Sequence, residues 1–291
     1  MLFSMDEFRQ NLRKSTGFRV FIYLMALFGC SLLGGLVTLL LTHGIVQLKI
    51  GQGISSALIF IAPPLILYAF TREQPLREIG FRKPISAWLF LLGVALMFIS
   101  LPLTNLLTSW NEQMSLGTSF EVLEKWMQML EDTAKTLTDQ MLQVDTIWGL
   151  LGNLLVIALI PAIGEELTFR GMLQQGLVRR CKNPHVGIIL SAAIFSFIHF
   201  QFYGFLPRMF LGILLGYLFY YSGSLWVSIL MHFVNNGAAV VVAYLEYKGL
   251  TEVDMDHFGE TSNLWLIGAS FLLTVGAVML SRIISEKYGR E

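Results

Sequence analysis

The chain has 291 residues, of which 55% are hydrophobic and only 14% are charged, and its 20 basic residues balance its 20 acidic residues. A soluble domain of this length usually carries about a quarter charged residues, so the composition excludes an ordinary soluble fold and indicates an integral membrane protein. The two cysteines, Cys30 and Cys181, are too few for a disulfide framework and do not form a metal-binding pair. Membrane lipid is therefore an expected partner, and nucleic acid is not.

The apolar segments predict eight membrane crossings, because a spanning helix needs about 20 mostly apolar residues. In chain order the predicted spans are Val20–Leu41, Ile54–Phe70, Ala87–Leu107, Ile147–Ile163, His185–Phe200, Arg208–Tyr221, Leu225–Leu245 and Leu264–Ile284. Prolines inside or beside these spans are tolerable where neighbouring helices cover the backbone groups that they leave unpaired. No internal repeat or soluble domain is apparent. The sequence therefore predicts an all-α, polytopic membrane protein of about eight transmembrane helices, folded as one integral domain over residues 1–291.

Basic residues are distributed unequally between the two sides of the predicted membrane domain. Fourteen lie on the side of the two termini: Arg9, Arg13, Lys14, Arg19, Arg72, Arg77, Arg82, Lys83, Arg179, Arg180, Lys182, Arg282, Lys287 and Arg290. Five lie on the other side: Lys49, Lys125, Lys135, Arg208 and Lys248. Because short cytoplasmic loops are enriched in Lys and Arg, both termini are predicted to be cytoplasmic. A prokaryotic cell membrane is the expected location.

The long outer loop, Glu112–Asp145, contains an amphipathic pattern. Apolar residues recur at three- and four-residue steps between charged ones, at Leu123, Trp126, Leu130, Ala134, Leu137 and Met141. This periodicity predicts a helix with one apolar face. The helix could lie flat on the outer leaflet, or it could act as a lid that contacts a substrate.

Three groups of polar residues fall inside the apolar segments, where hydrocarbon cannot solvate them and where ionisable groups usually have a function. They are Glu165-Glu166-Leu167-Thr168-Phe169-Arg170, then Phe195 to His199, then His232 to Asn236. The four-residue spacing of Glu166 and Arg170 allows a structural ion pair on one helical face, while Glu165 points about 100° away. Each group alone could be a clamp between helices. The coincidence of three such groups favours a functional site.

The spacing along the chain predicts that these groups lie at a similar depth. If the fourth and fifth spans form a hairpin that turns near Lys182–Asn183, Glu165 lies 17 residues before Lys182 and His199 lies 17 residues after it. At 1.5 Å per residue, each is about 25 Å along its helix from the turn. His232 lies about 7 residues into the seventh span from the same side, so it is also intramembrane.

The three groups resemble the three motifs of the CPBP family of intramembrane proteases, which includes CAAX prenyl endopeptidases and bacteriocin-processing proteins of the Abi type. The family pattern is Glu-Glu-x-x-x-Arg, then Phe-x-x-x-His, then His-x-x-x-Asn, and it stands here in order and without departure. The resemblance covers roughly Leu150–Leu245, so a catalytic core is expected at about residues 147–245. It implies an endopeptidase that hydrolyses a membrane-associated or lipidated peptide, such as a prenylated CAAX-type peptide.

Peptide hydrolysis needs an activated water and hydrogen-bond donors for the developing oxyanion. Glu165 is the expected general base, and His199 is expected to hold the water and to protonate the leaving amine. His232 and Asn236 share one helical face and are the expected oxyanion donors. The resemblance implies the same roles, and this scheme requires no cofactor.

Two other interpretations remain open at this point. Glu165, His199 and His232 are a two-histidine, one-carboxylate set that would suit a catalytic zinc ion with an open water position. A transporter or immunity-type membrane scaffold could instead use the same residues as a proton relay or as a partner-binding groove. Inverted repeats would favour a transporter, and none is visible in the sequence.

Overall fold

The computed structural model describes residue 12 and residues 16–41, 44–71, 75–81, 86–252, 261 and 263–288. The described residues are almost entirely helical and form no strand, which confirms the all-α membrane fold. Two histidines and several basic residues of the predicted cytoplasmic side lie outside the described residues: His43, His257, Arg9, Arg13, Lys14, Arg72, Arg82, Lys83 and Arg290.

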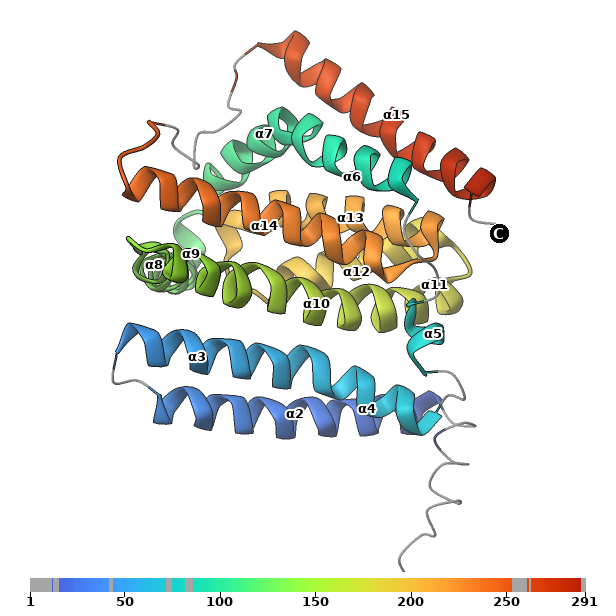
Figure 1. Cartoon of the computed structure of the whole chain (residues 1–291), viewed down its shortest axis with the longest axis horizontal. Helices are drawn as coiled ribbons and strands as arrows, with labels where there is room; N and C mark the ends of the chain where they lie inside the picture. Colours follow the sequence, from blue (N-terminus) through green and yellow to red (C-terminus); the bar gives the residue numbers. More distant parts are fainter. Residues whose placement is uncertain are drawn as a thin grey trace, which may run out of the picture.

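The helices lie side by side in a bundle, with α2 and α3 at one edge, α6, α7 and α15 at the other, and α10, α13 and α14 between them (Figure 1). The α-helices are α2 (Thr16–Leu40), α3 (Ile45–Ser56), α4 (Ala62–Thr71), α5 (Pro75–Ile79), α6 (Ala87–Ile99), α7 (Leu101–Glu112), α8 (Glu121–Leu142), α9 (Ile147–Asn153), α10 (Ile160–Glu166), α11 (Gln175–Cys181), α12 (Pro184–Phe197), α13 (Phe205–Ser222), α14 (Leu225–Tyr247) and α15 (Leu264–Tyr288). Between them lie the π-helical segments η1 (Ala57–Ile61), η3 (Leu154–Leu159) and η4 (Leu167–Gln174) and the 3₁₀ turns η2 (Thr118–Phe120) and η5 (Phe202–Gly204).

Each of the eight predicted spans is helical, although the count of eight is approximate. Within the described part of the chain, six helical segments are long and apolar enough to cross a membrane: Phe18–Leu40, Ile45–Thr71, Ile147–Cys181, Phe202–Ser222, Leu225–Tyr247 and Leu264–Lys287. The helices α6 and α7 are bent by 42° relative to each other, and the number of candidate spans is seven if this pair is counted as one span. The helix α12 is apolar but shorter than the others.

The fourth span is longer than the sequence predicts. The predicted end at Ile163 is wrong, since the helical segment continues through Glu165 and Glu166 to Cys181. The charged residues do not end the helix, because their side chains find partners inside the protein, as described below. The longer span carries both glutamates near its middle.

Wide helical turns allow two of the spans to pass their prolines without breaking. The segment η1 lies just before Pro63–Pro64, and η3 lies just before Pro161. At η3 the N–H of Ile160 donates to the carbonyl oxygen of Leu155, five residues back. A proline lacks an N–H, and its ring would clash with the carbonyl four residues earlier, so a wider turn at this point makes room for it.

The hairpin between the fourth and fifth spans turns where the sequence predicts, at Lys182–Asn183. Lys182 adopts a left-handed conformation with φ of 54°, and the Asn183 side chain accepts a hydrogen bond of 2.9 Å from the N–H of His185 at the start of α12. At Gly187 a Cβ atom would lie 2.7 Å from the backbone nitrogen of Val178. The absence of a side chain there allows α11 and α12 to pack closely.

The glycine pair of α13, Gly212 and Gly216, brings this helix close to the fourth and fifth spans. A Cβ atom at Gly212 would lie 3.0 Å from the Cβ of Ala192 on α12. The carbonyl groups of these two buried glycines accept hydrogen bonds from two residues that lie one turn apart on η4. Arg170 donates to Gly212 at 3.0 Å, and Gln174 donates to Gly216 at 2.9 Å. The two glycines therefore lie at a helix crossing that also satisfies two buried polar side chains, Arg170 and Gln174.

The amphipathic segment of the outer loop forms one helix, α8, as predicted. Its last turn is attached to the bundle, because Asn153 donates to the carbonyl oxygen of Met141 at 2.9 Å. Its middle is attached by Glu131, which accepts a hydrogen bond of 3.2 Å from the N–H of Tyr203. Trp126, one turn earlier, remains exposed. One part of α8 therefore packs on the protein, while another part presents apolar side chains outward.

Both ends of the fourth span can be tested for their side of the membrane. In Figure 1, α8 and α9 lie at one end of the bundle and α11 lies at the other. With Cys30 and Cys181 replaced, we expect an impermeant thiol reagent to label Lys135→Cys on α8 in intact cells. The same reagent should label Arg180→Cys on α11 only after the membrane is opened. Labelling of both positions from one side would contradict the predicted topology.

Candidate active site

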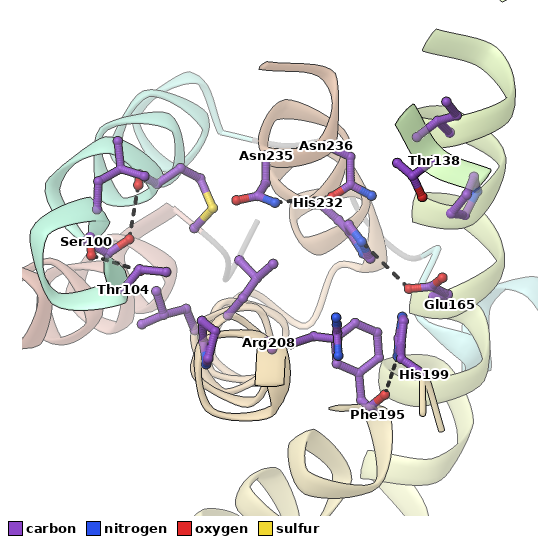
Figure 2. Close-up of a pocket in the computed structure, with 18 of the residues that line it drawn as sticks. Ser100, Thr104, Thr138, Glu165, Phe195, His199, Arg208, His232, Asn235 and Asn236 are labelled. Carbon is purple, nitrogen blue, oxygen red and sulfur yellow. Dashed lines mark hydrogen bonds and ion pairs between the residues drawn. The ribbon is translucent and has the colours of Figure 1, made fainter. Parts of the chain in front are cut away.

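Four residues from three separate spans line one cavity of about 470 Å³. They are Glu165 of α10, His199 just after α12, and His232 and Asn236 of α14. Figure 2 shows these side chains turned toward one another around the cavity. The structure therefore brings together all four residues that the sequence analysis predicts to be catalytic. Helices α7 and α8 also contribute to the walls, through Thr104 and Thr138.

The other glutamate, Glu166, faces away from this cavity and is fully buried. Its Oε1 atom accepts a hydrogen bond of 2.8 Å from Arg170, which is the ion pair that the four-residue spacing predicts. The same oxygen also lies 2.9 Å from Nδ1 of His232, a contact that the sequence does not predict. One buried carboxylate therefore holds residues of the first and third motifs.

Arg170 is only 1% exposed, and its charge has several partners. Besides its bonds to Glu166 and to the Gly212 carbonyl, its guanidinium lies 4.8 Å from the centre of the Phe195 ring. Such a position over an aromatic face is attractive for a cation. Because burying an unpaired charge is very costly, these contacts fix how the fourth, fifth and sixth spans pack against one another.

The ring of His232 is oriented by Glu166. An ionised carboxylate can only accept hydrogen bonds, so Nδ1 of His232 must carry a proton and donate it. The second ring nitrogen, Nε2, faces the cavity and lies 3.7 Å from Oε2 of Glu165. This arrangement leaves Nε2 as the atom of His232 that can interact with a bound molecule.

His199 is oriented by a backbone carbonyl in a similar way. Its Nδ1 atom lies 2.8 Å from the carbonyl oxygen of Phe195, one helical turn earlier, so Nδ1 donates and Nε2 remains available. The Phe195 ring packs edge-on against His199 and His232, at centroid distances of 5.1 and 6.1 Å. The phenylalanine of the second motif is therefore a packing centre for both histidines and for Arg170.

Glu165 lies where two cavities meet. It is 9% exposed and lines the first cavity together with His199. Both residues also line a second cavity of about 660 Å³, which extends toward α2 and α3 and is bordered by Gln52 and Ser55. The carboxylate can thus be reached from both sides of the fourth span.

Asn236 has a neighbour that orients its amide group. The side-chain nitrogen of Asn235 donates to Oδ1 of Asn236 at 3.1 Å, and both residues line the first cavity. With its oxygen occupied as an acceptor, Asn236 keeps its own amide N–H groups free for another partner.

One charged residue of this cavity, Arg208, is not predicted by the sequence. Its position at the start of the predicted sixth span places it among the basic residues of the outer side. The helix α13 begins earlier, at Phe205, so Arg208 lies inside the helix and lines the cavity. The apolar run just before it, from Phe202 to Pro207, is the signal that could have extended the span.

The zinc alternative can be compared with this geometry. Among the residues that the structure describes, no three His, Cys, Asp or Glu side chains are grouped as the ligands of one metal ion. Glu165, His199 and His232, as they stand, therefore do not fit a three-ligand zinc site.

Arg170 and Glu166 should stabilise the fold rather than take part in the chemistry. We expect Arg170→Ala to lower the yield of folded protein and its melting temperature, since loss of one partner of a buried pair typically costs about 3–5 kcal/mol in soluble proteins. The exposed Arg179→Ala, on α11, is the matched control and should behave like wild type. If Arg170→Ala melts like wild type while activity disappears, Arg170 belongs to the chemistry.

The same part of the chain matches a known family model. Residues 147–238 match the model described as type II CAAX prenyl endopeptidase Rce1-like. No curated protein and no solved structure matches the chain. The matched residues run from the start of α9 into α14 and include all three motifs. Over residues 147–238, the match confirms the resemblance that the motifs indicate: this part of the chain is similar to the Rce1-like type II CAAX prenyl endopeptidases, a protease family.

Proposed function

We propose that this protein hydrolyses a peptide bond in a membrane-associated, CAAX-type peptide, with a water molecule activated by Glu165. The observation that carries the proposal is the meeting of Glu165, His199 and His232 at one intramembrane cavity, within the residues that match the protease family. A carboxylate and two histidines from three spans can supply a base, a proton carrier and an electrophilic donor.

In this mechanism Glu165 takes a proton from the water as the water oxygen attacks the carbonyl carbon of the substrate. Nε2 of His199 faces the same cavity and accepts the second hydrogen of the water, which fixes its direction. As the tetrahedral intermediate collapses, the C–N bond breaks, and the proton held by Glu165 passes to the leaving amine through His199. The products are a new carboxylate and a free amine.

The negative oxygen of the intermediate needs donors that are already in place. Asn236 offers its free amide N–H group. His232 can donate from Nε2 only as the doubly protonated imidazolium, because its other proton is directed to Glu166. The proposal therefore assigns a positive charge to His232 in the reactive state, next to the position where negative charge develops.

The second cavity supports a substrate that is delivered from the membrane. It reaches Glu165 from the side of α2 and α3, and α2 carries highly exposed apolar residues such as Phe28 and Leu32. A lipidated peptide could keep its apolar part in this region while its peptide bond approaches Glu165. Because α3, α7 and α8 help to enclose the site, we treat residues 1–291 as one domain with its catalytic core at about 147–245.

The role of Glu165 can be tested by a change that keeps its shape. We expect Glu165→Gln to lower kcat for a fluorogenic prenylated peptide by about 10²–10⁴-fold, the usual contribution of a general base. Folded yield should be unchanged, since the ion pair of Arg170 with Glu166 is intact. Glu246→Gln, an exposed glutamate of α14, is the control. Full activity of Glu165→Gln in purified protein would refute the proposed base.

Metal removal separates the proposed mechanism from the zinc alternative. We expect protein stripped of metal, as verified by elemental analysis, to keep most of its activity. We also expect Asn236→Ala to lower kcat by about 10²–10³-fold, as loss of one oxyanion donor typically does. If activity instead disappears with the metal and returns with one equivalent of zinc, Glu165, His199 and His232 act as metal ligands.

A further inference from the structure

Arg208 is a cation in the active-site cavity to which the proposed mechanism gives no role. It lies one turn inside α13, and Figure 2 shows its side chain reaching toward His199 and Phe195. Its guanidinium is held by Gln201, whose carbonyl oxygen and Oε1 atom accept hydrogen bonds of 3.2 and 2.9 Å. The cation is therefore fixed in place beside the reacting groups.

The partners of Arg208 are neutral, unlike those of Arg170. A guanidinium has five N–H donors, and the two bonds to Gln201 leave three of them for other acceptors. None of the ion pairs found among the described residues involves Arg208. Glu131 and Glu165 act on its charge only over a longer distance. The cavity therefore contains a positioned positive charge that forms no close ion pair among the described residues and has N–H donors to spare.

The backbone near Arg208 leaves room for its guanidinium. A Cβ atom at Gly204 would lie 2.9 Å from one terminal nitrogen of Arg208 and 3.5 Å from its central carbon. Gly204 has an ordinary negative φ of −102°, so the backbone conformation does not require glycine here. Any larger residue would push the guanidinium away from Gln201.

We propose that Arg208 binds the C-terminal carboxylate of the substrate and thereby selects peptides that are cut a few residues from a free C-terminus. The inference rests on the proposed function. A guanidinium pairs with a carboxylate through two parallel hydrogen bonds, and its spare donors suit this geometry. The cavity of about 470 Å³ that Arg208 shares with Glu165 is the size of a small-ligand site, so it fits a short peptide end.

Binding of twin peptides tests this assignment without relying on catalysis. The probes are dye-labelled octapeptides with a farnesylated cysteine four residues from the end, one with a free carboxylate and one with a C-terminal amide. Their dissociation constants are measured by fluorescence polarisation in phosphatidylcholine nanodiscs, so that no anionic lipid competes. The protein carries Glu165→Gln to prevent cleavage.

We expect the carboxylate peptide to bind about 10- to 100-fold more tightly than its amide twin, the factor expected of hydrogen bonds to a charged group. Adding Arg208→Gln should remove this preference and leave the amide peptide little affected. Arg179→Gln, which changes an exposed arginine of α11, should preserve the preference. If Arg208→Gln does not fold, Gly204→Ala replaces it and should reduce the same ratio by displacing the guanidinium.

Equal binding of the two peptides to the parent protein would overturn the assignment. The assignment would also be overturned if Arg208→Gln, made in the otherwise wild-type enzyme, lowered kcat equally for both peptides. That result is typical of a residue that stabilises the oxyanion. Selective binding without any cleavage by the wild type would refute the proposed function and keep the role of Arg208. Cleavage without a preference for the carboxylate peptide would support the proposed function and refute the role of Arg208.

Discussion

The buried carboxylate of Glu166 has to be satisfied where neither lipid nor water can do so. Its Oε1 atom accepts from both Arg170 and His232, and Arg170 in turn donates to the backbone of α13 and lies over Phe195 of α12. Because a charge inside the membrane is costly unless it is paired, these contacts favour one arrangement of four spans over others. The two histidines that face the cavity, His232 and His199, are therefore held in position by Glu166 and Phe195.

Two adjacent glutamates have different environments because of helical geometry alone. One residue of helix rotation, about 100°, separates the direction of Glu166 from that of Glu165. Glu166 points into the contact between helices, where the positive charge of Arg170 compensates its negative charge. Glu165 points into the junction of two cavities, where a water molecule could reach it. Under the proposed function, a peptide could reach Glu165 with its lipidated part in one of these cavities and its C-terminal part in the other.

Local patterns predicted much of this fold. The lengths of the apolar runs predicted the helical segments. The equal distances of Glu165 and His199 from Lys182 along the chain fitted a turn at Lys182–Asn183, and the four-residue spacing of Glu166 and Arg170 predicted their ion pair. The contact between Glu166 and His232 was not predicted, since it joins residues 66 positions apart and depends on how the spans pack. Arg208 was assigned to the outer side because the apolar residues just before it, Phe202 to Pro207, were not counted as part of the span.

The tautomer of His232 is the most direct measure of whether Glu166 organises the site. With ¹⁵N-labelled histidine, the chain gives at most five ring spin systems, and His232→Gln identifies the one of interest. The account predicts a protonated, hydrogen-bonded Nδ1 whose ¹⁵N shift changes when Glu166 is replaced by Gln. A His232 ring protonated only at Nε2, and insensitive to Glu166→Gln, would contradict it.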